Sequence, residues 1–168
     1  MKPETTSLRD HAQAIRSQLE PCWLPDIYRE RILKTRTRAY HFGELPRNPR
    51  VNIQHTLLGV ELKIGRRRYL CPDLATARYL SVFARAGCKD VAIPYDITQV
   101  SYFADELESA WQRMFLLIEH NLPNTAPRTR IRGLLIAKLR VEVAAAGAGS
   151  AVPEFKRSTR QRTTGNEI

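Results

Sequence analysis

Apolar and polar positions alternate along residues 60–64 of this 168-residue chain, within a strand predicted near residues 57–64. The alternating positions are Val60, Glu61, Leu62, Lys63 and Ile64. This period-two pattern is typical of a strand with one apolar and one polar face. Gly65-Arg66 follows and suits a two-residue turn, because glycine accepts the positive φ that a type II′ turn requires at its first central position. The pattern therefore predicts a hairpin whose returning strand covers residues 67–71.

A helix and a third strand are predicted after the hairpin. Residues 74–86 repeat apolar side chains at helical spacing, Asp73 can cap the first turn, and Gly87 can end the last. The short apolar run within residues 90–94 is typical of a buried strand. A right-handed crossover would place this strand parallel to residues 67–71. We therefore expect a small β-β-α-β sheet.

The longest apolar pattern predicts a helix over residues 97–121. From Val100 onward, its apolar side chains recur at steps of three and four: Phe103, Leu107, Trp111, Met114 and Ile118. At 1.5 Å per residue such a helix is about 35 Å long, which is more than a small sheet can cover. The excess either packs against predicted helices near residues 8–19 and 131–143, or forms an interface with a partner or a second copy. Under the second alternative, the five residues after Val100 form the protein interface.

These elements predict an α+β protein with four segments. Residues 1–24 form an N-terminal helical segment, and residues 25–50 form a basic, arginine-rich segment. Residues 51–146 form the α/β core, which includes the long helix and a C-terminal helix. Residues 147–168 are rich first in small residues and then in basic ones, and we expect them to be a disordered basic tail.

The positive charge is concentrated toward the two ends of the chain. The net charge is +10. Residues 1–50 carry ten basic and six acidic groups, and residues 122–168 carry nine basic and three acidic groups. Residues 51–121 are neutral overall, with eight basic and eight acidic groups. Read as a helix from Asp26, the arginine-rich segment would be basic around much of its circumference. Arginine side chains match phosphate oxygens and release counterions on binding. The candidate nucleic-acid-binding residues are Arg29, Arg31, Lys34, Arg36, Arg38, Arg66, Arg67 and Arg68.

Several protein classes are disfavoured because their patterns are missing. Cys22, Cys71 and Cys88 are widely spaced and lack paired histidines nearby, so we expect neither a metal site nor a disulfide framework. No Gly-rich phosphate loop or nucleophile elbow occurs, which disfavours nucleotide hydrolases and ordinary acyl hydrolases. No apolar run reaches the roughly 18 residues of a membrane span, and the first residues lack the apolar core of a signal peptide. We expect a cytoplasmic protein without a cofactor.

One pair of residues suggests catalysis. Glu61-x-Lys63, on a predicted strand that is followed by a helix and another strand, resembles the Glu-x-Lys half-site of the PD-(D/E)xK nuclease superfamily, including the small VRR-type nucleases. The resemblance covers residues 57–94. It implies that Glu61 is a magnesium ligand and that Lys63 positions or activates the attacking water. The second carboxylate of that family is missing from the preceding strand, residues 51–57.

The sequence is compatible with three functions. The first is a non-enzymatic protein that binds DNA or RNA through phosphate contacts of the eight basic residues. The second is a structural or regulatory interaction module. Its long helix would meet a partner or a second copy, and its basic flanks would meet an acidic protein or a membrane surface. The third is the metal-dependent nuclease. The sequence favours the first.

Overall fold

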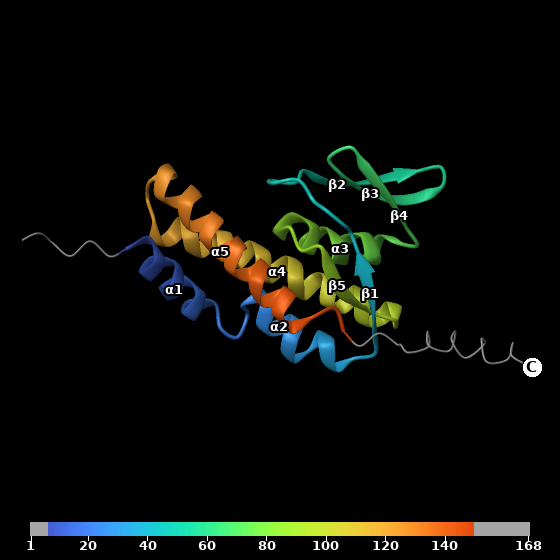
Figure 1. Cartoon of the computed structure of the whole chain (residues 1–168), viewed down its shortest axis with the longest axis horizontal. Helices are drawn as coiled ribbons and strands as arrows, with labels where there is room; N and C mark the ends of the chain where they lie inside the picture. Colours follow the sequence, from blue (N-terminus) through green and yellow to red (C-terminus); the bar gives the residue numbers. More distant parts are fainter. Residues whose placement is uncertain (1–6, 150–168) are drawn as a thin grey trace, which may run out of the picture.

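Five α-helices and two small antiparallel sheets make up the described part of the chain (Figure 1). The computed structural model describes residues 7–149. In chain order the elements are α1 (Leu8–Leu19), α2 (Leu24–Glu30), the 3-10 helix η1 (Ile32–Lys34), β1 (Thr37–His41), β2 (Val51–Thr56), β3 (Gly59–Ile64), β4 (Arg67–Cys71), α3 (Leu74–Ala86), β5 (Asp90–Pro94), α4 (Ile97–Asn121) and α5 (Thr125–Ala146). The α+β class and the long helix, α4, are confirmed. Most of the predicted tail over residues 147–168 lies outside the described residues.

The predicted hairpin is present within a three-stranded antiparallel sheet, β2-β3-β4. Ile64 pairs with Arg67, so Gly65-Arg66 forms a two-residue turn, and the φ of Gly65 is 62°. β2 pairs with the other edge of β3. One face of this sheet packs on α3 and buries Leu62 and Ile64. The opposite face carries the polar side chains of β3, as the alternating pattern predicts.

The predicted parallel pairing of β5 with β4 is wrong. β5 instead pairs antiparallel with β1 in a separate sheet, with Ala39 opposite Ala92. Tyrosine hydroxyls occupy the other edge of β5: the Ala92 N–H donates to Tyr28 over 2.9 Å, and Tyr79 donates to the Ala92 carbonyl over 2.6 Å. Buried backbone groups require hydrogen-bond partners. Because side chains supply them here, β5 needs no strand on that edge.

The arginine-rich segment, residues 25–50, belongs to the folded core and is not one continuous basic helix. α2 ends at Glu30, and the chain continues through η1 into β1. The segment buries the side chains of Tyr28, Ile32 and Phe42. Arg36 and Arg38 flank the buried Thr37, a period-two pattern typical of a strand. This short strand was not predicted from the sequence, because the many charged residues around it interrupt the apolar pattern.

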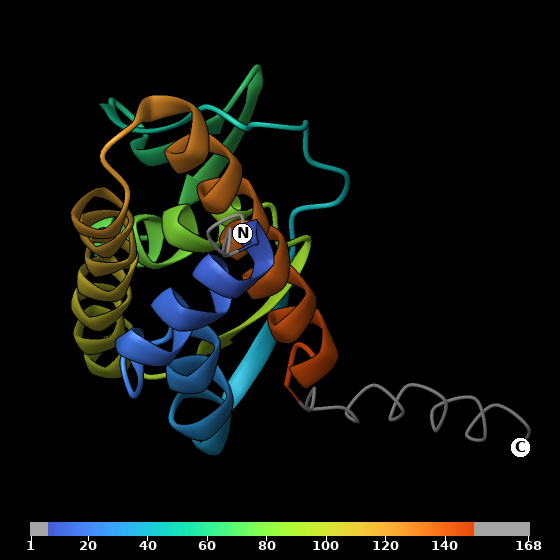
Figure 2. The same ribbon diagram turned by 90° about the vertical axis from the view of Figure 1, so that its left-hand side faces the viewer.

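α3 is the central helix of the molecule. The sheet β2-β3-β4 lies on one side of it and α4 on the other (Figure 1). α1 lies between α4 and α5 (Figure 2), so the predicted packing of the helices near residues 8–19 and 131–143 onto the long helix is confirmed. No helix within residues 7–149 combines the length and the apolar content needed to cross a membrane.

The apolar stripe of α4 is buried inside the chain. Trp111 is 9% exposed, and the remaining members are at most 5% exposed: Phe103, Leu107, Met114 and Ile118. The stripe lies within the common core of the helices. Intramolecular packing is therefore the alternative that the structure shows. These five side chains are not available to a partner, which corrects their assignment to a protein interface.

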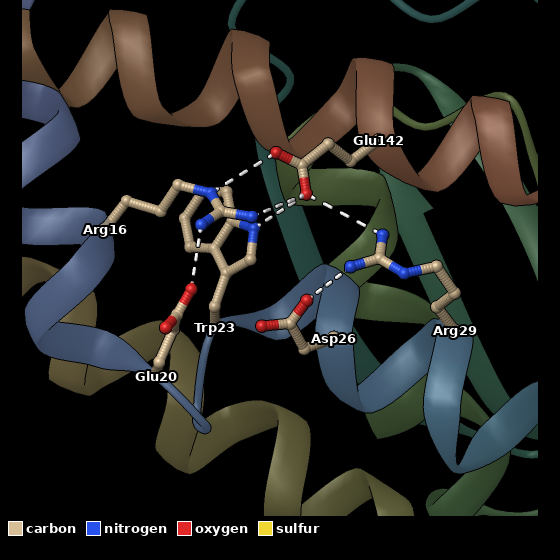
Figure 3. Close-up of polar contacts among 6 residues, drawn as sticks. All are labelled: Arg16, Glu20, Trp23, Asp26, Arg29 and Glu142. Atoms are coloured by element: carbon tan, nitrogen blue, oxygen red, sulfur yellow. Dashed lines mark hydrogen bonds and ion pairs between the residues drawn. The ribbon is translucent and has the colours of Figure 1, made fainter.

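A network of polar contacts joins α1, α2 and α5 (Figure 3). Glu142 of α5 accepts hydrogen bonds from Trp23 Nε1 at 2.9 Å and from Arg16 at 3.4 Å. Arg29 approaches the same carboxylate at 3.7 Å and also pairs with Asp26. Burial alone would raise the pKa of Glu142, but the contacts with Trp23 and Arg16 outweigh it and hold this pKa below its ordinary value.

A candidate nucleic-acid interface on the three-stranded sheet

Four of the eight candidate basic residues contact other residues of the same chain through their side chains. Arg29 pairs with Asp26 within α2. Arg31 donates to Glu106 over 3.1 Å and to the Tyr102 hydroxyl over 2.7 Å, and so ties the end of α2 to α4. Such contacts satisfy the donors that a phosphate would otherwise accept from. These two arginines are therefore weak candidates for binding nucleic acid.

Arg36 and Arg67 also have partners within the chain. The Arg36 guanidinium lies 5.2 Å from the centre of the Tyr95 ring, a cation–π geometry. Arg67 donates to the Glu44 carbonyl over 2.8 Å and to the Phe42 carbonyl over 3.4 Å. Arg67 therefore holds the loop after β1 against β4.

The other four candidates have no hydrogen bond or ion pair from their side chains to any residue in the described range 7–149. Lys34 is exposed in η1, and Arg38 is half-buried on β1. Arg66 and Arg68 are exposed at the turn between β3 and β4 and in β4 itself. The eight residues thus do not lie in one cluster, but Arg66 and Arg68 lie close together at the end of the sheet.

Two further cations lie beside Arg66 and Arg68. Lys63 is directly opposite Arg68 in the register of β3 and β4. The carbonyl of Arg50 accepts a hydrogen bond from the Gly65 N–H over 2.9 Å, which places Arg50 beside the turn. We call the cluster of Arg50, Lys63, Arg66 and Arg68 the basic sheet end. None of these four side chains forms an ion pair with the part of the chain that the structure describes.

Two cations of the basic sheet end, Lys63 and Arg68, lie directly opposite each other on the outer face that also carries Glu61. Like charges directly opposite each other on neighbouring strands destabilise a sheet, as Lys63 and Arg68 do here. An anion between their head groups would remove this repulsion. The arrangement is therefore chemically suited to bind phosphate oxygens.

Glu61 and Lys63 share the outer face of β3, as their alternation predicts. Glu61 lies opposite Leu70 on β4 and opposite Gln54 on β2. Its Oε1 atom is buried and has no hydrogen-bond partner among the described residues. Within the same range, no group of three or more His, Cys, Asp or Glu side chains could hold a metal ion. The residue opposite Glu61 on the preceding strand is an amide, so these residues do not supply the ligand set that the nuclease resemblance implies.

The opposite end of the same sheet is apolar, a feature that the sequence analysis missed. Leu57 and Leu58 form the turn between β2 and β3 and are 105% and 81% exposed. Leu70, on the outer face nearby, is 60% exposed. Consecutive hairpin turns lie at opposite ends of an antiparallel sheet, so the leucines are separated from the basic sheet end. The sequence contains an indication of this apolar surface, because turns are usually polar and two leucines stand between Thr56 and Gly59.

Comparison of the chain with protein-family models, with characterised proteins and with solved structures found no match.

Proposed function

We propose that this protein binds nucleic acid without cleaving it, through phosphate contacts at the basic sheet end. The observation that supports the proposal is the direct opposition of Lys63 and Arg68, next to the turn that carries Arg66. Three cations are thus held close together by the backbone register and not by pairing with carboxylates. Lysine and arginine without internal partners are free to replace counterions on a phosphate backbone.

The chemistry of the outer face favours backbone contacts over base recognition. Besides its two cations and Glu61, this face carries Asn52, Gln54, Thr56, Gly59 and Leu70. It has no aromatic side chain on which an unpaired base could stack. Phosphate contacts fix position but carry no sequence information directly. We therefore propose weak sequence preference and a duplex, not a single strand, as the better ligand.

The salt dependence of binding tests this proposal. Four phosphate contacts predict a slope of about −3.6 for log K against log salt on duplex DNA. The double variant Lys63→Gln/Arg68→Gln should reduce the magnitude of that slope by about 1.8. The measurement is a salt titration of binding to a labelled duplex, repeated with single-stranded DNA and with RNA.

A matched control separates local contacts from total charge. Arg85 on α3 and Arg113 on α4 are exposed and have no ion pair among the described residues. The variant Arg85→Gln/Arg113→Gln removes the same charge and should leave the slope unchanged. Equal slopes for the two double variants would show that binding is a property of net charge and not of the basic sheet end. Cleavage of the duplex in Mg²⁺ that is lost in Glu61→Gln would contradict the non-enzymatic part of the proposal.

A further inference from the structure

A cavity of about 530 Å³ lies away from the turn that carries Arg66. It is formed where the end of α3, the facing ends of β1 and β5, and the last turns of α5 meet. None of the four residues of the basic sheet end lines it. Its volume falls within the range of about 300–1,000 Å³ that is usual for small-molecule sites. Its occupant would therefore be a small molecule and not a polymer.

Arg140 of α5 supplies an anchored cation on the cavity wall. Its Nε donates to the Ala86 carbonyl over 3.0 Å, at the C-terminal end of α3. A Cβ atom at Gly87 would lie 2.9 Å from Arg140 Nε, and Gly87 has a φ of +80°. Only glycine therefore combines this backbone conformation with the close approach of the guanidinium. Because one edge of the guanidinium is fixed, the side chain loses little further freedom when it binds a ligand.

The terminal nitrogens of Arg140 remain available. Neither Nη1 nor Nη2 forms a hydrogen bond or ion pair with any residue from 7 to 149. The other charged groups on the wall have contacts of their own: Asp90 contacts the His41 ring, and Lys89 pairs with Glu44 over 3.0 Å. Arg140 is thus a cation of the wall without an ion-pair partner among residues 7–149, and its forked geometry matches a carboxylate.

The remaining wall is mainly apolar. Val141 and Ala144 line it from α5, and Val141 is 66% exposed. Cys88 lines it from the loop after α3 and is buried. Burial raises the pKa of the Cys88 thiol to about 12, with Arg140 opposing the shift, so the group is neutral at physiological pH. Cys88 therefore contributes apolar surface and is not a poised nucleophile.

We propose that this cavity binds a small organic monoanion. Its carboxylate contacts the Arg140 guanidinium, and its aliphatic body packs against Val141, Ala144 and Cys88. The site combines what such a ligand requires, namely a concave apolar wall and one oriented polar group. This binding is independent of the basic sheet end.

An NMR titration of the full chain with octanoate tests the proposal, with 1-octanol as the neutral comparison. Octanoate should shift the amide signals of Gly87, Cys88, Asp90 and Gly147, which belong to the cavity wall. It should bind about tenfold more tightly than 1-octanol, the effect of one charge-assisted contact of about 1.4 kcal/mol. Equal affinity for the two compounds, or shifts confined to other regions, would overturn the proposal.

Variants of α5 provide the matched controls. Arg140→Gln should weaken octanoate binding about tenfold and leave 1-octanol unaffected. Arg130→Gln removes an exposed charge from the same helix and should change neither affinity. Since Arg140 also caps α3, the second variant Ala144→Phe fills the cavity from an exposed helix position and should abolish binding of both compounds. Unchanged octanoate affinity in Arg140→Gln or in Ala144→Phe would overturn the proposal.

Discussion

At the scale of single residues, Glu142 joins parts of the chain that are far apart in the sequence. Its carboxylate on α5 accepts hydrogen bonds from Trp23 Nε1, just before α2, and from Arg16 on α1 (Figure 3). These contacts lower its pKa in the folded state even though burial opposes them. The charged form of Glu142 is thus favoured by folding.

The carboxylate of Glu142 should stabilise the fold in a pH-dependent way. Its folded-state pKa is below the unfolded value of about 4.3, so the stabilisation is complete above that pH and is lost as pH falls through the lower folded-state pKa. Glu142→Gln should therefore lower the free energy of unfolding by about 1–2 kcal/mol at pH 7. The difference from the wild type should narrow below about pH 4.3.

Urea denaturation at a series of pH values measures this effect. Glu119→Gln, at an exposed position of α4, is the matched control and should change stability little at any pH. A Glu142→Gln destabilisation that stays constant from neutral to acidic pH would show that the charge of Glu142 has no part in it.

Hydrogen bonds and ion pairs of single side chains also explain which residues of the candidate site could be predicted from the sequence. Arg66 and Arg68 were predicted from their run of basic residues and have no described partner. Arg31 was predicted to bind nucleic acid by the same criterion. In the structure, its side chain donates to Glu106, which lies 75 positions away in the sequence. A sequence shows that a residue is charged, and only the fold shows whether another residue already satisfies that charge. Arg50 was missed because its proximity to the turn depends on strand pairing.

At the scale of elements, β5 has a strand on one edge and two tyrosine hydroxyls on the other. Tyr28 accepts from the Ala92 N–H and donates to the Gly147 carbonyl, so one hydroxyl joins α2, β5 and the end of α5. Burial raises the pKa of Tyr28 to about 12, so the hydroxyl keeps its proton at neutral pH and can both donate and accept.

Tyr28→Phe should destabilise the protein by about 1–3 kcal/mol, because it leaves the buried Ala92 N–H without a partner. Tyr95→Phe is the control, since Tyr95 is 47% exposed and its hydroxyl has no hydrogen bond within residues 7–149. Thermal and urea unfolding measure the difference. Equal stability of the two variants would contradict the role of Tyr28 as a substitute for a neighbouring strand.

Helices and the hairpin could be predicted because their burial follows a fixed period. The residues buried on α5 recur at steps of four: Ile131, Leu135, Leu139 and Val143. The partner of β5 could not be predicted in the same way. β1 has five residues, its apolar pattern is interrupted by charge, and the tyrosines that close the other edge of β5 come from two different helices. Short strands are specified by such distant contacts more than by local pattern.

At the scale of the whole molecule, the sheet β2-β3-β4 is the part with the most distinctive surface. It lies on the opposite side of α3 from α4 (Figure 1), and its inner face buries Leu62 and Ile64. Its outer face has cations at one end and exposed leucines at the other. The long helix α4, by contrast, buries its apolar stripe in the core. The basic sheet end is therefore the surface for which we propose phosphate contacts.

Backbone NMR of the full chain, titrated with a short DNA duplex at low salt, tests whether the basic sheet end contacts phosphates. The largest amide shifts should fall on the four residues of the basic sheet end and on the adjoining Asn52 and Gly65, and added salt should reverse them. Small shifts at these positions together with large shifts on α5, or shifts spread evenly over all exposed cations, would contradict this proposal.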